Sequence, residues 1–136
     1  MEKGEYKYQE IIGKIIGAPM KVHAAMGNGF QELIYHGALE IEMRDCGLGF
    51  VREMNMPIFY KGTQIDQRRV DFFVEEKIMV ELKAVIQLEN VHLAQAINYL
   101  EAYNMEVGLL INFGSISLQF KRLGNPKFVA ATPVKR

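Results

Sequence analysis

The residues with the clearest capacity for chemistry are two carboxylates and a lysine, Asp71, Glu81 and Lys83. They lie in or directly beside two short apolar runs that are separated by the charged residues 75–77. Apolar runs of this length around a tight polar turn are typical of a β-hairpin. The pairing of the two strands therefore decides whether the three side chains meet.

Two registers can be compared for this hairpin. A two-residue loop would set charged side chains against apolar ones, for example Asp71 against Val80. A three-residue loop avoids these mismatches and sets Asp71 directly across from Glu81, so we favour it. Strand alternation then places Lys83 on the same face. The pairs that this register predicts on the apolar face are Val74 with Ile78, Phe72 with Val80, and Val70 with Leu82.

Two carboxylates whose Cβ atoms lie about 5 Å apart repel one another, and both pKa values rise unless a cation lies between them. Ligation by oxygen atoms of Asp71, Glu81, a backbone carbonyl and water suits Mg²⁺ or Mn²⁺ rather than zinc. Such an ion can polarise a phosphoryl oxygen and lower the pKa of a bound water. Lys83 could position that water and neutralise charge that develops on the phosphate. The pattern predicts a metal-dependent phosphodiesterase site.

The same three residues also have a purely structural interpretation. They could be solvated charges on an exposed hairpin face, with Lys83 offsetting Glu81. On the spacing alone, this structural interpretation is favoured.

Polar side chains on a predicted third helix could complete the site. His92, Gln95 and Tyr99 recur at i, i+3 and i+7 and form a polar face beside the buried one. A short loop joins the Glu81 strand to this helix, so its first turns should lie near the strand end. We expect Gln95 to bond a phosphate or a water, and Tyr99 and His92 to border the substrate. An amphipathic boundary face would explain the same pattern equally well.

A second predicted helix carries Glu32 and Tyr35 on one face, behind a glycine turn. Glu32 lies in the first turn, where the helix dipole favours a carboxylate, and this is a sufficient structural reason for an acid there. His23 lies before the same turn, between apolar residues. We expect it to be a hydrogen-bonded structural histidine.

Hydrophobic periodicity predicts eight elements in the order α-α-β-β-β-α-β-β. Pro19 falls inside the first helical pattern, and since a proline there costs roughly 3 kcal/mol, a kink or a break is expected near it. Asn90 is the expected N-cap of the third helix. The predicted elements are helices from about Tyr6 to Ala25, from Phe30 to Asp45, and from Asn90 to about Tyr103 with Ala94, Ile97 and Leu100 buried, and strands around 56–60, 70–74, 78–82, Val107–Asn112 and 116–120.

The composition predicts one domain, because 136 residues with 49% hydrophobic content suffice for one core. The 16 basic and 16 acidic residues cancel, so any contact with nucleic acid must be local. Cys46 is the single cysteine, which excludes an internal disulfide, and we expect a buried, inert thiol. The absence of a long apolar run predicts a cytoplasmic protein without a membrane partner. Residues 126–136 are expected to form a loose basic tail.

The run Gly29–Tyr35 reads G-x-x-E-x-x-Y, and the chain from Ile11 to about Arg122 resembles the GxxExxY family of small proteins in the PD-(D/E)XK nuclease superfamily. The further matching segments are Val22–His23, the Asp71 strand, Glu81–Lys83, His92 with a Q-x-x-x-Y pattern at Gln95 and Tyr99, and Gly108–Phe113. The resemblance implies an α/β fold with a restriction-endonuclease-like core, in which helices flank a mixed central sheet. Its implied site residues are Asp71 and Glu81 as metal ligands, Lys83 as the catalytic lysine, Glu32 as an accessory acid, and Gln95 and Tyr99 at the border.

Two main functions follow from these patterns. The leading hypothesis is a Mg²⁺- or Mn²⁺-dependent nuclease that hydrolyses phosphodiester bonds in DNA or RNA, with DNA the favoured partner. The alternative is a non-catalytic module that binds nucleic acid or protein and retains the nuclease fold, and the zero net charge favours it. A third hypothesis is that the chain acts as a homodimer or as a subunit of a larger complex.

Overall fold

Eight elements follow one another along residues 8–130, the part of the chain that the computed structural model describes. Their order confirms the predicted α-α-β-β-β-α-β-β sequence. The elements are α2 (Gln9–Met26), α3 (Glu32–Asp45), β1 (Phe50–Tyr60), β2 (Thr63–Val74), β3 (Ile78–Lys83), α4 (Asn90–Ala102), β4 (Val107–Asn112) and β5 (Gln119–Gly124).

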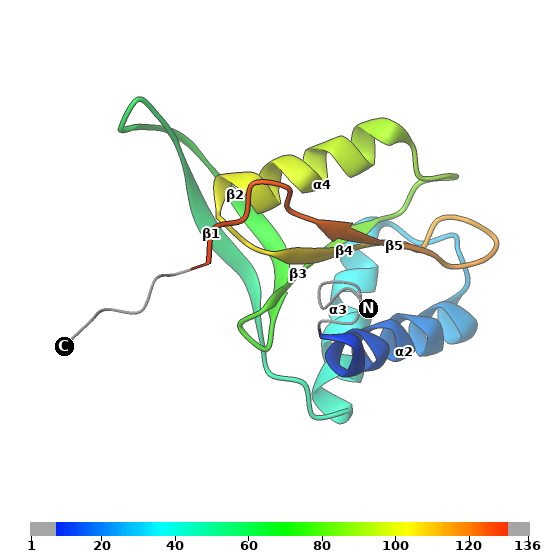
Figure 1. Cartoon of the computed structure of the whole chain (residues 1–136). Helices are drawn as coiled ribbons and strands as arrows, with labels where there is room; N and C mark the ends of the chain where they lie inside the picture. The colour runs from blue at the N-terminus through cyan, green and yellow to red at the C-terminus, as the bar shows by residue number, and fades with distance from the viewer. Residues whose placement is uncertain (1–7, 131–136) are drawn as a thin grey trace.

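The five strands form one mixed sheet in the order β1-β2-β3-β4-β5, with helices on both faces (Figure 1). Neighbouring strands are antiparallel except for β3 and β4, which are parallel and are connected through α4. Strands covered on both faces lack polar alternation, and every residue of β4 is buried. The parallel pair β3–β4 therefore forms the buried centre of the sheet.

Two hydrophobic cores lie on the two faces of this sheet. On one face α2 and α3 pack over residues such as Phe72, Val80 and Ile111, and on the other face α4 packs over Met79 and Leu110. Successive residues of β3 and β4 alternate between the two cores, as strand geometry requires. The apolar runs of β3 and β4 thus contribute side chains to both cores.

The predicted register of the β2–β3 hairpin is confirmed. Val74 pairs with Ile78 and Phe72 pairs with Val80, around a loop of three residues, 75–77. The ladder has three pairs and ends at Phe72 and Val80, so the further pair of Val70 with Leu82 is not formed. The side chains that replace it belong to the candidate site.

Helix α2 runs without a break through Pro19, so the predicted break there is wrong. Pro19 is buried, and the apolar face around it packs into the first core, including the fully buried Ile15. Burial of that face offsets the missing backbone hydrogen bond, because tertiary packing contributes more to helix stability than local propensity. The predicted start at Tyr6 lies outside the described residues.

Three local predictions about α4 and β5 are also wrong. The residue that caps α4 is Glu89, whose backbone N–H donates to His92 Nδ1 over 2.9 Å, and Asn90 is already helical. Within α4, Ala96 is buried and Ala94 is exposed, which rotates the predicted stripe. Strand β5 begins only at Gln119, because the preceding residues form a surface loop whose Ile116 is 91% exposed.

Cys46 is exposed, which corrects the prediction of a buried thiol. It lies at the C-terminal end of α3, where the chain turns away from the core, and its Sγ donates to the carbonyl of Met43. The predicted loose tail is likewise fastened at its start, since Asn104 and Val129 exchange two hydrogen bonds of 2.9 and 3.0 Å. Residues 131–136 of that tail lie outside the described part. Among residues 8–130 no helix is long and apolar enough to cross a membrane.

A matched pair of isoleucines tests this division of core and surface. Ile111 is 0% exposed in β4 and Ile116 is 91% exposed in the loop. Ile111→Ala should lower the free energy of unfolding by about 2–5 kcal/mol, because it leaves a cavity in the first core. Ile116→Ala should change it by less than about 0.5 kcal/mol. Urea unfolding of both variants gives the comparison, and equal losses would contradict the assigned core.

Candidate active site

A buried carboxylate, Glu81, and a half-buried one, Asp71, join β2 to β3 at the point where their ladder ends. The backbone N–H of Asp71 donates to Glu81 Oε1 over 3.0 Å, and the backbone N–H of Leu82 donates to Asp71 Oδ2 over 2.7 Å. These two bonds occupy backbone donors that a further strand pair would have used. Each carboxylate thus has one oxygen fixed by the neighbouring strand, which leaves its second oxygen for another partner.

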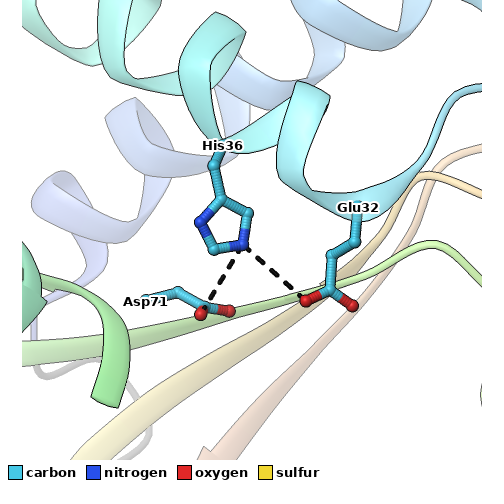
Figure 2. A group of neighbouring side chains, drawn as sticks. All are labelled: Glu32, His36 and Asp71. Atoms are coloured by element: carbon cyan, nitrogen blue, oxygen red, sulfur yellow. Dashed lines mark ion pairs between the residues drawn. The ribbon is translucent and has the colours of Figure 1, made fainter.

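Helix α3 brings two more side chains to this point. Glu32 and His36 are one helical turn apart and lie on the same face. His36 Nε2 lies 3.6 Å from Asp71 Oδ1 and 3.8 Å from Glu32 Oε2 (Figure 2). His36 is buried, whereas the Glu32 side chain is 44% exposed. The cluster therefore opens to solvent on the Glu32 side.

Tyr35 fixes the position of α3 from within the first core. Its ring is fully buried and stacks on Phe113 at a centroid distance of 4.5 Å. Its hydroxyl donates to the carbonyl of Gly27 over 2.6 Å and accepts from the backbone N–H of Phe30. The tyrosine of the G-x-x-E-x-x-Y run thus ties the glycine turn to the core and sets where the Glu32 turn begins. His23 Nε2 donates to the carbonyl of Ser115 over 3.0 Å, which confirms that this histidine is hydrogen-bonded.

The turn after β3 is fixed by a fully buried amide. Asn112 lies opposite Lys83 in the parallel register, and its side chain bonds both the N–H and the carbonyl of Val85 over 2.9 Å. Gly114 lies so close to the same turn that a Cβ would approach the Val85 backbone N to 2.5 Å. This packing determines where β3 ends and hence where Lys83 stands. The sequence did not single out Asn112, because its partner is fixed only by the fold.

Burial and mutual repulsion weaken the acidity of the two carboxyls. Burial, followed by the charge of Asp71, raises the pKa of Glu81 to about 8. Burial also raises the pKa of Asp71, against the opposing effects of the Leu82 N–H and the charges of His36 and Lys83. Lys83 favours the ionised form of both acids. Without a further cation, the cluster holds protons that carboxyls in water would have lost.

The donor atoms of the cluster fit a divalent metal ion. One atom each from Glu32, His36 and Asp71 lies within 4.8 Å of the others. The separations of 3.6 and 3.8 Å exceed hydrogen-bond length, and they lie below the maximum of about 4.2 Å between two ligands that share one ion at about 2.1 Å. Glu81 lies directly beside this group through its bond to Asp71. The structure thus adds a histidine to the predicted carboxylate set.

The predicted residues of α4 have other contacts in the structure. Gln95 is exposed, and Tyr99 packs against the second core under α4. His92 serves the cap of the helix. Within residues 8–130, none of the three bonds a carboxylate of the cluster, so their roles at a substrate stay a prediction. His36, by contrast, was missed, although its i, i+4 spacing from Glu32 was the available signal.

The raised pKa of Glu81 predicts how the free energy of unfolding depends on pH. The pKa of Glu81 is about 8 in the folded protein and 4.5 in the reference state. Between these values the folded chain holds a proton that the unfolded chain has released, so the free energy of unfolding should fall as pH rises. Urea unfolding in EDTA from pH 4.5 to 9 measures this slope. Glu81→Gln should flatten it, and the exposed Glu76→Gln should leave it as in the parent; a rising slope in the parent would contradict the assignment.

Comparison with known proteins identifies the fold and the superfamily of this chain. The chain matches the solved crystal structure of SSO0001 with a TM-score of 0.57 at 18% identity. The match covers 88% of this chain and 61% of that one, so the chain spans less than two thirds of its length. No curated protein matches. The family model of the PD-(D/E)XK nuclease superfamily matches residues 9–123, a range that includes every residue of the cluster. The chain therefore belongs to the PD-(D/E)XK nuclease superfamily.

Proposed function

We propose that the chain is a metal-dependent nuclease of the GxxExxY type that hydrolyses phosphodiester bonds, with DNA as its preferred substrate. The observation that carries the proposal is the convergence of Glu32, His36 and Asp71 on one point beside Glu81 and Lys83. Membership of a nuclease superfamily gives this arrangement its chemical context.

The proposed metal ligands are Glu32, His36, Asp71 and Glu81. Carboxylates suit Mg²⁺ and Mn²⁺, whereas an imidazole suits Mg²⁺ less well. A set that mixes both donor types favours Mn²⁺ as the better-bound ion. When bound, such an ion would polarise a phosphoryl oxygen and acidify a water. It would also stabilise the ionised form of Glu81, which burial otherwise disfavours.

The chain's own groups would act on charge and position. The Lys83 ammonium group is close enough to affect both Asp71 and Glu81, and it can neutralise negative charge that grows on a phosphate at the same place. The backbone donors of Asp71 and Leu82 hold the two carboxylates in fixed orientations. A site whose groups are oriented before substrate arrives needs little rearrangement during the reaction.

Cleavage assays test the proposal directly. Purified protein is incubated with single- and double-stranded DNA and RNA in the presence of Mn²⁺ or Mg²⁺. Asp71→Asn should lower the rate by roughly 100-fold or more, because it removes a charged ligand of the proposed metal ion. Asp45→Asn, an exposed acid at the end of α3, is the matched control and should cleave like the parent. Cleavage that survives the Asp71 substitution would discard the assignment.

Metal titration tests the role of His36 independently of catalysis. Calorimetry with Mn²⁺ should show that His36→Gln weakens binding by roughly tenfold or more. The same change at His92, which bonds only the start of α4, should leave the affinity unchanged. Equal affinities for all three proteins would exclude His36 as a ligand. Absence of any Mn²⁺ heat in the parent would instead favour a non-catalytic module that keeps the nuclease fold.

A further inference from the structure

The hairpin of β1 and β2 extends far beyond the rest of the sheet (Figure 1). We call residues 55–69 the arm. Its two strands stay paired up to Tyr60 and Thr63, yet β2 is exposed at every residue from Thr63 to Arg69. A two-stranded ribbon is at best marginally stable by itself. This ribbon therefore presents surface that the domain does not need for its own core.

One face of the arm is supported near its base and the other is free. Met56 and Val70 pack into the core under α4, and the Tyr103 hydroxyl donates to the Met56 carbonyl over 2.8 Å. Residues that are paired across two strands share a face. The opposite face therefore carries the exposed pairs Asn55 with Arg69, Pro57 with Gln67, and Phe59 with Gln64.

The free face has a distinctive chemistry. Beside Pro57 and the 59% exposed Phe59, it presents one guanidinium and three amide side chains, and no carboxylate between Asn55 and Arg69. Arginine, asparagine and glutamine are the side chains that pair bidentately with guanine and adenine edges. An apolar protein partner would instead require a continuous hydrophobic face. The free face thus suits a hydrogen-bonding partner.

The arm also concentrates positive charge. It contains Lys61, Arg68 and Arg69 against the single acid Asp66, a net charge of +2 in a chain whose total is zero. Asp66 Oδ1 additionally accepts the N–H of Gln67, which engages part of its charge. Lys61 stands at the tip, with its Nζ 5.6 Å from the centre of the Tyr60 ring. Arg69 additionally lies 3.8 Å from a carboxylate oxygen of Glu53, just outside the arm. The cations of the arm complement a phosphate backbone.

The free face leads directly to the carboxylate cluster. Val70 points to the α4 side and Asp71 faces His36 on the α3 side, so alternation puts Arg69 on the same face as Asp71. The two residues are about 7 Å apart along the strand, at about 3.4 Å per residue. A nucleic acid that lies on the arm would therefore pass the proposed active site.

We infer that the arm is the duplex-DNA contact of this protein, with its free face laid into the major groove and its cations on the flanking phosphates. The inference rests on the proposed nuclease function, because it names how that site would receive its substrate. The major groove of B-form DNA is about 12 Å wide and admits a two-stranded ribbon. The major groove of duplex RNA is too deep and narrow for side chains to read.

Fluorescence anisotropy with a labelled 20-bp DNA duplex in EDTA tests the inference without cleavage. The full chain is compared with R68Q/R69Q and with K14Q/K21Q, which removes two exposed charges from α2 instead. R68Q/R69Q should weaken binding by about tenfold or more and reduce the salt-dependence slope by about 2, since each lost phosphate contact contributes roughly 0.9. K14Q/K21Q should bind within about twofold of the parent. Thermal melting confirms that both variants are folded.

Several outcomes would overturn the inference. These are an unchanged affinity in R68Q/R69Q, an equal loss in K14Q/K21Q, or arm-dependent binding of duplex RNA as tight as that of DNA. Sedimentation that shows Phe59→Ser breaking a dimer, with DNA affinity unchanged, would make the arm a protein interface. Arm-dependent DNA binding without Mn²⁺-dependent cleavage would keep this inference and discard only the nuclease. Undiminished cleavage by R68Q/R69Q at low DNA concentration would discard only the inference that the arm binds DNA.

Discussion

The two hydrogen bonds from backbone N–H groups to the carboxylates of Asp71 and Glu81 are the constraint on which the rest of the site depends. Each carboxylate takes an N–H from the opposite strand, so β2 and β3 stay joined although their ladder has ended. Two buried acids would otherwise destabilise this junction, because desolvation and mutual repulsion both act against them. The fold therefore keeps two carboxyls where their ionised forms are unfavourable without a cation. Carboxyls with pKa values shifted in this way are common at functional sites.

The other elements place partners around that junction from different directions. Tyr35, stacked on Phe113, determines where the helix that carries His36 crosses the sheet. The parallel pairing of β3 with β4 puts Asn112 opposite Lys83, and its amide secures the following turn. Core packing on one side and a buried amide on the other thus fix the positions of His36 and Lys83 on either side of Asp71. Precision at the site follows from rigid neighbours and does not depend on contacts among the charges themselves.

Sequence patterns predicted the element order and the β2–β3 register because apolar pairing across a hairpin is a local property. They also placed Asp71 beside Glu81. They did not predict the end of the ladder, since side-chain oxygens compete with backbone carbonyls only once both strands are in place. His36 was missed for a similar reason, as an apolar-flanked histidine becomes a ligand candidate only when α3 packs over Asp71. Pro19 and Cys46 show the same limit, because tertiary packing determined the unbroken helix and the exposed thiol.

One irregular position connects the candidate site with the arm. Glu53 has a φ of 56°, and the β1–β2 pairing that would join it to Asp71 is missing, although the same register continues on both sides. A left-handed residue within a strand re-aims the side chains around it. Here Asp71 turns to the α3 side together with its neighbour Phe72, so strict alternation is interrupted once, beside the catalytic candidate. The interruption lets a single strand bury apolar residues at one end, expose a polar face at the other, and present Asp71 between them. A chain with no net charge can in this way concentrate its cations where a phosphate would meet the carboxylates.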